Sequence, residues 1–148
     1  LSKKLDTNNL NIKISDLDNN NYTGGAAVNV GNPHVIFFVD NNENFEIHKI
    51  GPEIEHHPLF PERCNVTLAT VVNKELIKVK VWERGAGLTK ACGTAACATA
   101  FAAMKNGLSS NKVDIEFSTG KLLIFIDENN SIHMKGPVSD IKEINIKI

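Results

Sequence analysis

One stretch constrains the fold more than any other: a strand-like run leads through a glycine-rich loop into an alanine-rich segment. The strand-like run covers residues 76–81, and the alanine-rich segment covers residues 94–105. Alanine has the highest helix propensity, and the Asn-Gly pair at 106–107 is typical of a helix end. The stretch therefore predicts a strand, a tight loop and a helix over about residues 94–106.

Cys92 lies at the predicted start of this helix. The first N–H groups of a helix are unpaired and carry partial positive charge, so they favour a thiolate over a thiol and can hold a carboxylate. We therefore expect Cys92 to be reactive, with a thiol pKa lowered toward neutrality. Cys64 and Cys97 fall in a predicted strand and in the helix, and we expect both to be core residues.

The rest of the chain alternates short apolar runs with polar turns, which predicts strands. A short helix is expected within residues 45–55, interrupted by Gly51 and Pro52. The predicted strands cover residues 10–14, 26–30, 35–39, 113–117, 122–126 and 132–135, a hairpin pairs 64–72 with 76–82, and an alternating tail covers 141–148. Together these elements predict a single α+β domain over residues 1–148, in which a curved antiparallel sheet surrounds the central helix.

Composition excludes several classes of function. The chain has 148 residues and a net charge of −1, so nothing in its charge favours binding to nucleic acid or to an anionic membrane. No apolar run reaches the roughly 20 residues of a membrane span. Three cysteines without a secretory signal predict a reducing cytoplasm. No cysteine or histidine spacing predicts a metal site, because no C-x-x-C occurs and His56 and His57 are adjacent.

Polar residues near the loop suggest a pocket for a small amino acid. The Arg84 guanidinium suits a carboxylate, and the Glu83 carboxylate suits an ammonium. A thiolate at Cys92 could take the α-proton. Inverting a stereocentre also needs a second acid on the opposite face, and the sequence offers no candidate for it.

Three motifs resemble those of one family, the diaminopimelate epimerases. Residues 83–97 (Glu-Arg-Gly-Ala-Gly-Leu-Thr-Lys-Ala-Cys-Gly-Thr-Ala-Ala-Cys) closely resemble that family's second active-site signature. Residues 31–34 (Gly-Asn-Pro-His) and 63–66 (Arg-Cys-Asn-Val) resemble two further motifs. The resemblance implies a cofactor-independent epimerase that interconverts LL- and meso-diaminopimelate for lysine and peptidoglycan synthesis. It also implies two pseudo-symmetric lobes, with the substrate between them and one catalytic cysteine from each.

The resemblance also implies roles for individual residues. Cys92 matches the catalytic cysteine of the second lobe, and His34 and Glu83 match residues that support its chemistry. The implied substrate ligands are the side chains of Asn32, Asn65, Glu83 and Arg84 and the helix-start amides of Gly93 and Thr94. One departure from the family pattern is Ala95, where glycine is common; it lies beside the ligand positions and leaves the implied chemistry unchanged.

The first half of the family pattern, with its Cys-Gly-Asn-Gly signature and the opposing cysteine, is not in this sequence, which also lacks an initiator Met. We therefore expect the chain to be a C-terminal lobe that is inactive alone and needs the N-terminal lobe as its partner. The tail 141–148 is expected to belong with that lobe. Without it, the tail would be an unpaired strand prone to self-association.

Other functions remain open at this stage. A proline racemase-like or phenazine-type isomerase of the same superfamily would share the lobe and the cysteine. The Glu83–Arg84 pair favours diaminopimelate, whose distal end is itself a zwitterion that needs charged ligands. A cysteine hydrolase would need a Cys–His pair, for which His34 is a candidate only by position. A non-catalytic amino-acid-binding module is the third alternative.

Overall fold

The structure, a computed structural model, describes residues 25–89, 92–136 and 146–147. In this part of the chain, one sheet is accompanied by two α-helices and a short 3-10 helix, η2 (Asn42–Asn44). The α-helices are α1 (Ile47–Glu55) and α2 (Gly93–Lys105). The strands are β1 (Ala26–Asn29), β2 (Pro33–Phe38), β3 (Asn65–Asn73), β4 (Leu76–Glu83), β5 (Gly87–Thr89), β6 (Lys112–Phe117), β7 (Gly120–Ile126), β8 (Ser131–Lys135) and β9 (Ile146–Lys147).

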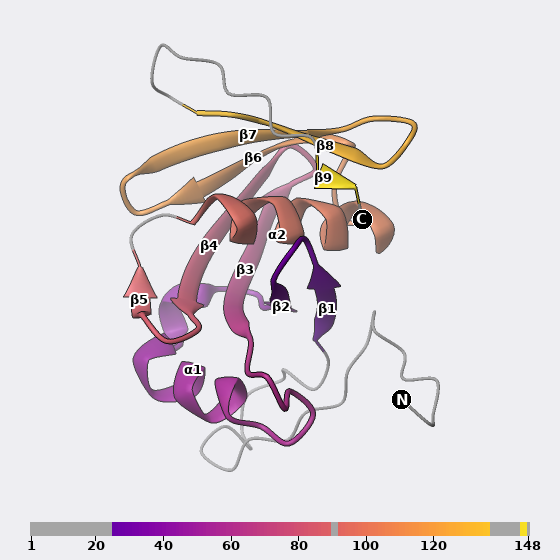
Figure 1. The fold of residues 1–148 in the computed structure, drawn as a ribbon. Coiled ribbons are helices and arrows are strands. Elements are labelled where there is room, and N and C mark those ends of the chain that lie inside the picture. The colour runs from indigo at the N-terminus through magenta and orange to yellow at the C-terminus, as the bar shows by residue number, and fades with distance from the viewer. Residues whose placement is uncertain (1–24, 90–91, 137–145, 148) are drawn as a thin grey trace.

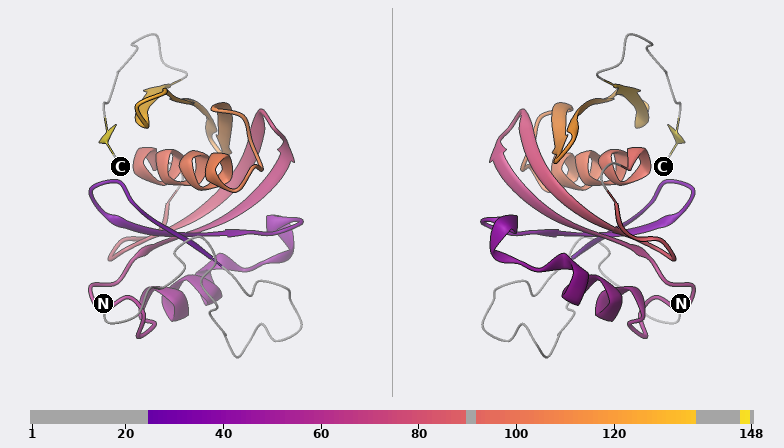
Figure 2. Two further views of the ribbon diagram at one scale, coloured as in Figure 1. Left: turned by 90° about the vertical axis from the view of Figure 1, so that its right-hand side faces the viewer. Right: turned by 90° about the vertical axis from the view of Figure 1, so that its left-hand side faces the viewer.

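The sheet runs in the order β1-β2-β3-β4-β6-β7-β8-β9, with β5 paired to β4. It curls so that β1–β4 lie on one side of α2 and β6–β8 arch over the other (Figures 1 and 2). This arrangement confirms the predicted α+β fold with a curved sheet around a central helix.

The sheet is mixed rather than wholly antiparallel, which corrects the sequence prediction. The β2–β3 and β4–β6 pairs are parallel. Parallel neighbours need a crossover connection, and each of these pairs is connected through an α-helix, α1 in the first case and α2 in the second.

Small side chains let α2 sit close to the sheet on both sides. Six of its buried residues are alanines, and Cys97, only 1% exposed, confirms the expected core position. Burial on several faces explains how a helix can be apolar almost all round. The helix packs against Ile36, Ala69, Ile77, Ile115, Ile124 and Ile132 in one core cluster.

The helix α1 covers the opposite face of β3 and β4 (Figure 2). Its buried isoleucines pack with Val66 and Leu68, and the fully buried Cys64 joins the same cluster, as expected of a core residue. The helix runs unbroken through Gly51 and Pro52. The predicted interruption is therefore wrong, because burial of this apolar face outweighs the poor helix propensity of the two residues.

Several strand predictions are confirmed and others lie outside the described residues. The β3–β4 hairpin and the strands β6, β7 and β8 occur where predicted. The short strand β5 within the glycine loop was not predicted. Residues 10–14 and most of the tail lie outside the described residues. Ile146 and Lys147 pair with β8, and whether the tail belongs with another lobe stays a prediction.

Candidate active site

The ends of the neighbouring strands β2, β3 and β4 together form one edge of the sheet. The predicted residues come together at this edge. The strands β2 and β3 are parallel, with His34 opposite Asn65. Because β4 is antiparallel to β3, its end at Trp82 lies opposite Val66. Glu83 and Arg84 therefore follow at the same edge. Cys92 is the N-terminal capping residue of α2, which packs on β2 and β3.

A chain of hydrogen bonds connects four of the predicted residues. His34 Nε2 lies 3.1 Å from Asn32 Oδ1. Asn32 Nδ2 donates to Thr94 Oγ1 over 3.4 Å, and Thr94 Oγ1 lies 3.5 Å from Cys92 Sγ. The buried imidazole is thus linked to the cysteine through an amide and a hydroxyl.

His34 is neutral at physiological pH. It is 1% exposed, and burial lowers its pKa from 6.5 to about 4, with a further lowering from the positive charge of Arg84. Since the Asn32 amide nitrogen donates to Thr94, its oxygen is left to accept from His34 Nε2–H. That tautomer makes Nδ1 an acceptor, and Nδ1 has no hydrogen-bond partner among the described residues. His34 therefore orients Asn32 as an uncharged donor.

The pKa of Cys92 is raised above its ordinary value of 9.0, which corrects the expected lowering. Burial is the largest cause, and a hydrogen bond to the Glu83 carboxylate adds to it. The Thr94 hydroxyl and the backbone of Ala95 act in the opposite direction but do not prevail. Desolvation and a neighbouring negative charge both disfavour a thiolate, so Cys92 carries its proton at neutral pH in this environment.

Asn65 holds three strands in place at this edge. Its Nδ2 donates to Pro33 O over 3.0 Å, and its Oδ1 accepts from Arg84 N over 2.8 Å. The side chain is 4% exposed. Its amide retains one further N–H to donate to a ligand.

Arg84 and Glu83 differ in exposure. Arg84 is exposed, and its Nη1 donates to Glu62 O over 3.2 Å. Glu83 is half-buried beside Cys92. The arrangement presents an exposed cation at Arg84 and a half-buried carboxylate at Glu83, which acts directly on the Cys92 thiol.

The start of α2 is closely packed at Gly93. A Cβ at this position would lie 3.2 Å from the side chain of Met134 in β8. The first-turn N–H groups of a helix have no intrahelical partner, and those of Gly93 and Thr94 follow Cys92 directly. They are suited to bind a carboxylate.

Glu55 and Trp82 belong to this edge but were not predicted. Trp82 Nε1 donates to Glu55 Oε1 over 2.9 Å, and Gly85 N donates to Glu55 Oε2 over 3.2 Å. In the sequence, Glu55 is one acidic residue at the end of a short amphipathic helix and carries no local signal of this contact.

Metal-ligand clusters and membrane-spanning helices are both absent from the described residues. No group of three His, Cys, Asp or Glu side chains there could hold a metal ion. No helix among the same residues is long and apolar enough to cross a membrane.

The family model and the curated relatives that match this chain agree on one family. The family model for diaminopimelate epimerase matches residues 26–141. A diaminopimelate epimerase of Pelagibacter ubique (strain HTCC1062) is 69% identical over all of this chain, which covers 54% of that relative. A diaminopimelate epimerase of Erythrobacter litoralis (strain HTCC2594) is 52% identical over 78% of this chain and 43% of that relative. The chain thus spans about half the length of these curated relatives.

A solved structure supports the fold. A phenazine biosynthesis protein of the PhzF family from Bacillus anthracis superposes with a TM-score of 0.51 at 20% identity. The superposition covers 72% of this chain and 34% of that structure. At this identity the likeness concerns the fold alone.

Proposed function

Because this chain belongs to the diaminopimelate epimerase family, we propose that it is one lobe of a cofactor-independent epimerase that acts on the α-carbon of diaminopimelate. The observation that carries the proposal is the position of Cys92. It lies at the start of α2, beside Glu83 and at the end of the hydrogen-bond chain from His34. This is a restrained thiol next to a site suited to a carboxylate.

Cys92 supplies one of the two groups that the reaction needs. Because its raised pKa keeps the thiol protonated near neutrality, Cys92 donates a proton to one face of the α-carbon while a base on the opposite face removes the original α-proton. The product side then holds a Cys92 thiolate and a protonated base. In the reverse reaction the Cys92 thiolate removes that proton again, and the re-formed thiol is a hydrogen-bond partner of Glu83.

The start of α2 stabilises the charge that develops during this transfer. An amino-acid α-proton is a very weak acid, so the carbanion needs preorganised donors. The N–H groups of Gly93 and Thr94 would hold the α-carboxylate and spread the charge onto it. Asn32, Asn65, Glu83 and Arg84 would bind the remaining polar groups of the substrate.

The opposing base is proposed to come from the part of the protein that this chain does not include. Since the chain spans about half of its curated relatives, a second lobe of similar size would close over Cys92. Such a lobe would exclude water from the site and supply the second cysteine that the family resemblance implies. This chain by itself should then not epimerise its substrate.

A comparison of two cysteine variants tests the proposal. The full-length protein is incubated with LL-diaminopimelate, and the stereoisomers are separated by chiral chromatography. Replacing Cys92 by Ala removes the proton donor and should lower the rate by about a thousandfold or more. Replacing the buried Cys97 by Ala is the matched control and should leave the rate nearly unchanged. Equal rates for wild type and the Cys92 variant would contradict the proposal.

A further inference from the structure

Glu55 is a buried carboxylate whose two oxygens are both engaged. It is the last residue of α1 and is 4% exposed. Its Oε1 accepts from the Trp82 indole N–H and its Oε2 from the Gly85 backbone N–H, over 2.9 and 3.2 Å. Hydrogen bonds to a charged acceptor are stronger than those between neutral groups, so these two contacts hold Trp82 and Gly85 firmly at the end of α1.

The two donors lie on either side of Glu83 and Arg84 in the sequence. Trp82 directly precedes Glu83, and Gly85 directly follows Arg84. The Arg84 N–H is itself held by Asn65 Oδ1 at 2.8 Å, so two consecutive backbone amides each meet a buried side-chain oxygen. A hydrogen bond from Ala86 N to Glu83 O, 3.1 Å long, closes the turn. The backbone around Glu83 and Arg84 is thereby fixed on both sides.

The same face of α1 also fixes the indole ring. Gly51 and Glu55 are four residues apart, so they lie on one face of the helix. A Cβ at Gly51 would come within 2.3 Å of Trp82 Cγ, and a Cβ at Gly87 in β5 would lie 3.4 Å from Trp82 Cη2. The indole therefore lies between two glycine backbones, where its N–H meets Glu55.

We propose that Glu55 is a positioning residue for the reaction: it acts through Trp82 and Gly85 to set the place of Glu83 and Arg84 relative to Cys92. The inference rests on the proposed function and extends it to a residue on the outer helix. Glutamine in place of Glu55 keeps the volume but offers one oxygen for two donors. Its NH2 group would face the other N–H, and the turn would loosen.

The test uses the full-length protein with Glu55→Gln and two companion variants. Glu53→Gln is the matched control, since Glu53 is exposed on the same helix. Trp82→Phe keeps an aromatic ring but removes the indole donor together with part of the ring system that packs near Gly87. Two readouts are taken: kcat and KM with LL-diaminopimelate, and hydrogen exchange of the Gly85 amide.

For Glu55→Gln we expect kcat/KM to fall at least about tenfold, because small displacements of positioned groups are costly. The Gly85 amide should exchange at least about tenfold faster, while amides within α2 keep their protection. Glu53→Gln should match wild type in both readouts. Trp82→Phe should lower kcat/KM by a factor between those of Glu53→Gln and Glu55→Gln.

The outcomes separate this inference from the proposed function. An active wild type with unchanged kcat/KM in Glu55→Gln would overturn the positioning role, as would lost activity with Gly85 protection intact. If Glu55→Gln does not fold, the Trp82→Phe variant provides the test. Wild-type kinetics in that variant would overturn the inference. An inactive wild-type protein would instead refute the proposed function. Even then, an unchanged exchange rate of the Gly85 amide in Glu55→Gln would show that Glu55 does not hold this amide.

Discussion

At the scale of single residues, burial shifts the pKa values of Cys92 and His34 in opposite directions, and it leaves both side chains uncharged. It raises the pKa of the thiol and lowers the pKa of the imidazole, because desolvation favours whichever form is uncharged. Both groups are therefore neutral near pH 7, and the hydrogen-bond chain between them contains no net charge. A neutral network of this kind fixes the orientation of its side chains. The charged groups of the site are Glu83 and Arg84.

The reactivity of Cys92 should follow from its neighbour Glu83. The carboxylate raises the pKa of the thiol, so Glu83→Gln should lower that pKa and increase the thiolate fraction. At about pH 8 the variant should react with iodoacetamide several-fold faster than wild type, as thiolate attack requires. Mass spectrometry of the Cys92 peptide measures the rate. Glu62→Gln, an exposed control, should leave it unchanged, and slower alkylation of the Glu83 variant would contradict this account.

His34 should make stability fall in mild acid. Its pKa is about 4 in the folded chain against 6.5 ordinarily, so the unfolded chain binds more protons between these values and stability is lost as pH falls through them. One pKa unit corresponds to about 1.4 kcal/mol, which gives a loss of about 3 kcal/mol from pH 7 to pH 4. Urea unfolding of wild type and His34→Gln measures it.

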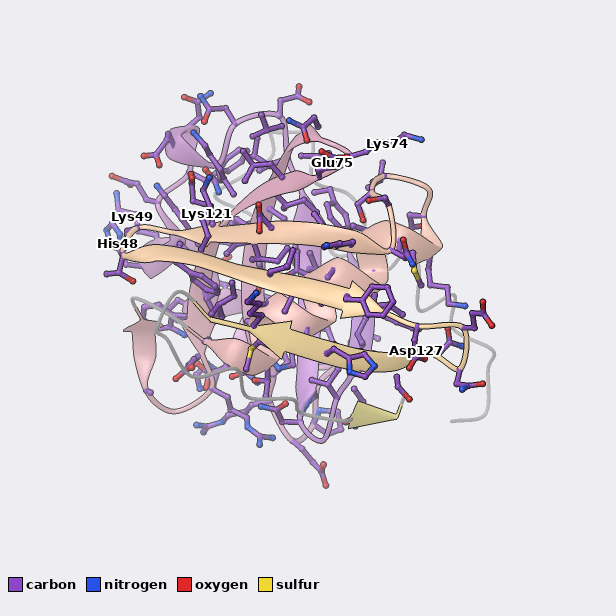
Figure 3. The ribbon with its side chains drawn as sticks, turned by 90° about the horizontal axis from the view of Figure 1, so that it is seen from above. His48, Lys49, Lys74, Glu75, Lys121 and Asp127 are labelled. Atoms are coloured by element: carbon purple, nitrogen blue, oxygen red, sulfur yellow. The ribbon has the colours of Figure 1, made fainter. Side chains whose placement is uncertain are left out.

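The variant should show a shallower pH dependence over this range. His56, exposed at the end of α1, is the control for substitution of a histidine as such. His133 on β8 is unsuitable, because it pairs with Asp127 over 2.9 Å and lowers the pKa of that carboxyl. Asp127 lies at the end of β7, where the chain turns toward β8 (Figure 3). Identical slopes for His34→Gln and wild type would show that His34 is not the group responsible.

At the scale of elements, close packing decides the behaviour of α1. Helix propensity alone predicts that Gly51→Ala stabilises the chain by about 1 kcal/mol. The structure predicts the opposite sign, because the added Cβ would lie 2.3 Å from Trp82 Cγ. Overpacking of this kind costs about 1–3 kcal/mol. Thermal unfolding compares Gly51→Ala with Glu53→Ala at an exposed position of the same helix. A more stable Gly51 variant would contradict the packing described.

The elements also mark where sequence-based prediction succeeds. The helix α2 and the β3–β4 hairpin were predictable because their signals are local: an alanine-rich segment in one case, alternation around a turn in the other. The parallel β2–β3 and β4–β6 pairs were not, because they depend on how α1 and α2 cross over. The unbroken α1 and the contact of Glu55 with Gly85 depend on tertiary packing around Trp82, which leaves no local pattern.

In the candidate site, the motifs predicted which residues gather but not their protonation. Hydrogen bonds join His34 and Asn32 of the 31–34 motif to Thr94 and Cys92 of the 83–97 motif, as the motifs suggested. The pKa of Cys92 was mispredicted because the helix start was weighed without Glu83 and without burial. Neither effect is visible in the local sequence, because Glu83 ends β4, Cys92 precedes α2, and the folded sheet brings the two together.

At the scale of the whole molecule, the chain is proposed to hold half of a catalytic apparatus. It spans about half the length of its curated relatives, and the described residues contribute one thiol at the start of α2. A two-base reaction requires groups on both faces of the α-carbon. Cys92 would serve one face, and under the proposal the group for the other face comes from a second lobe that this chain does not include.

The most direct test is solvent-hydrogen exchange at the α-carbon of LL-diaminopimelate in D2O, followed by NMR without added cofactor. The full-length protein should introduce deuterium at the α-carbon as the meso isomer forms. The 148-residue chain alone should do neither, and the full-length Cys92→Ser variant should lose formation of the meso isomer. Epimerisation by the chain alone, or undiminished turnover by the Cys92 variant, would contradict the account.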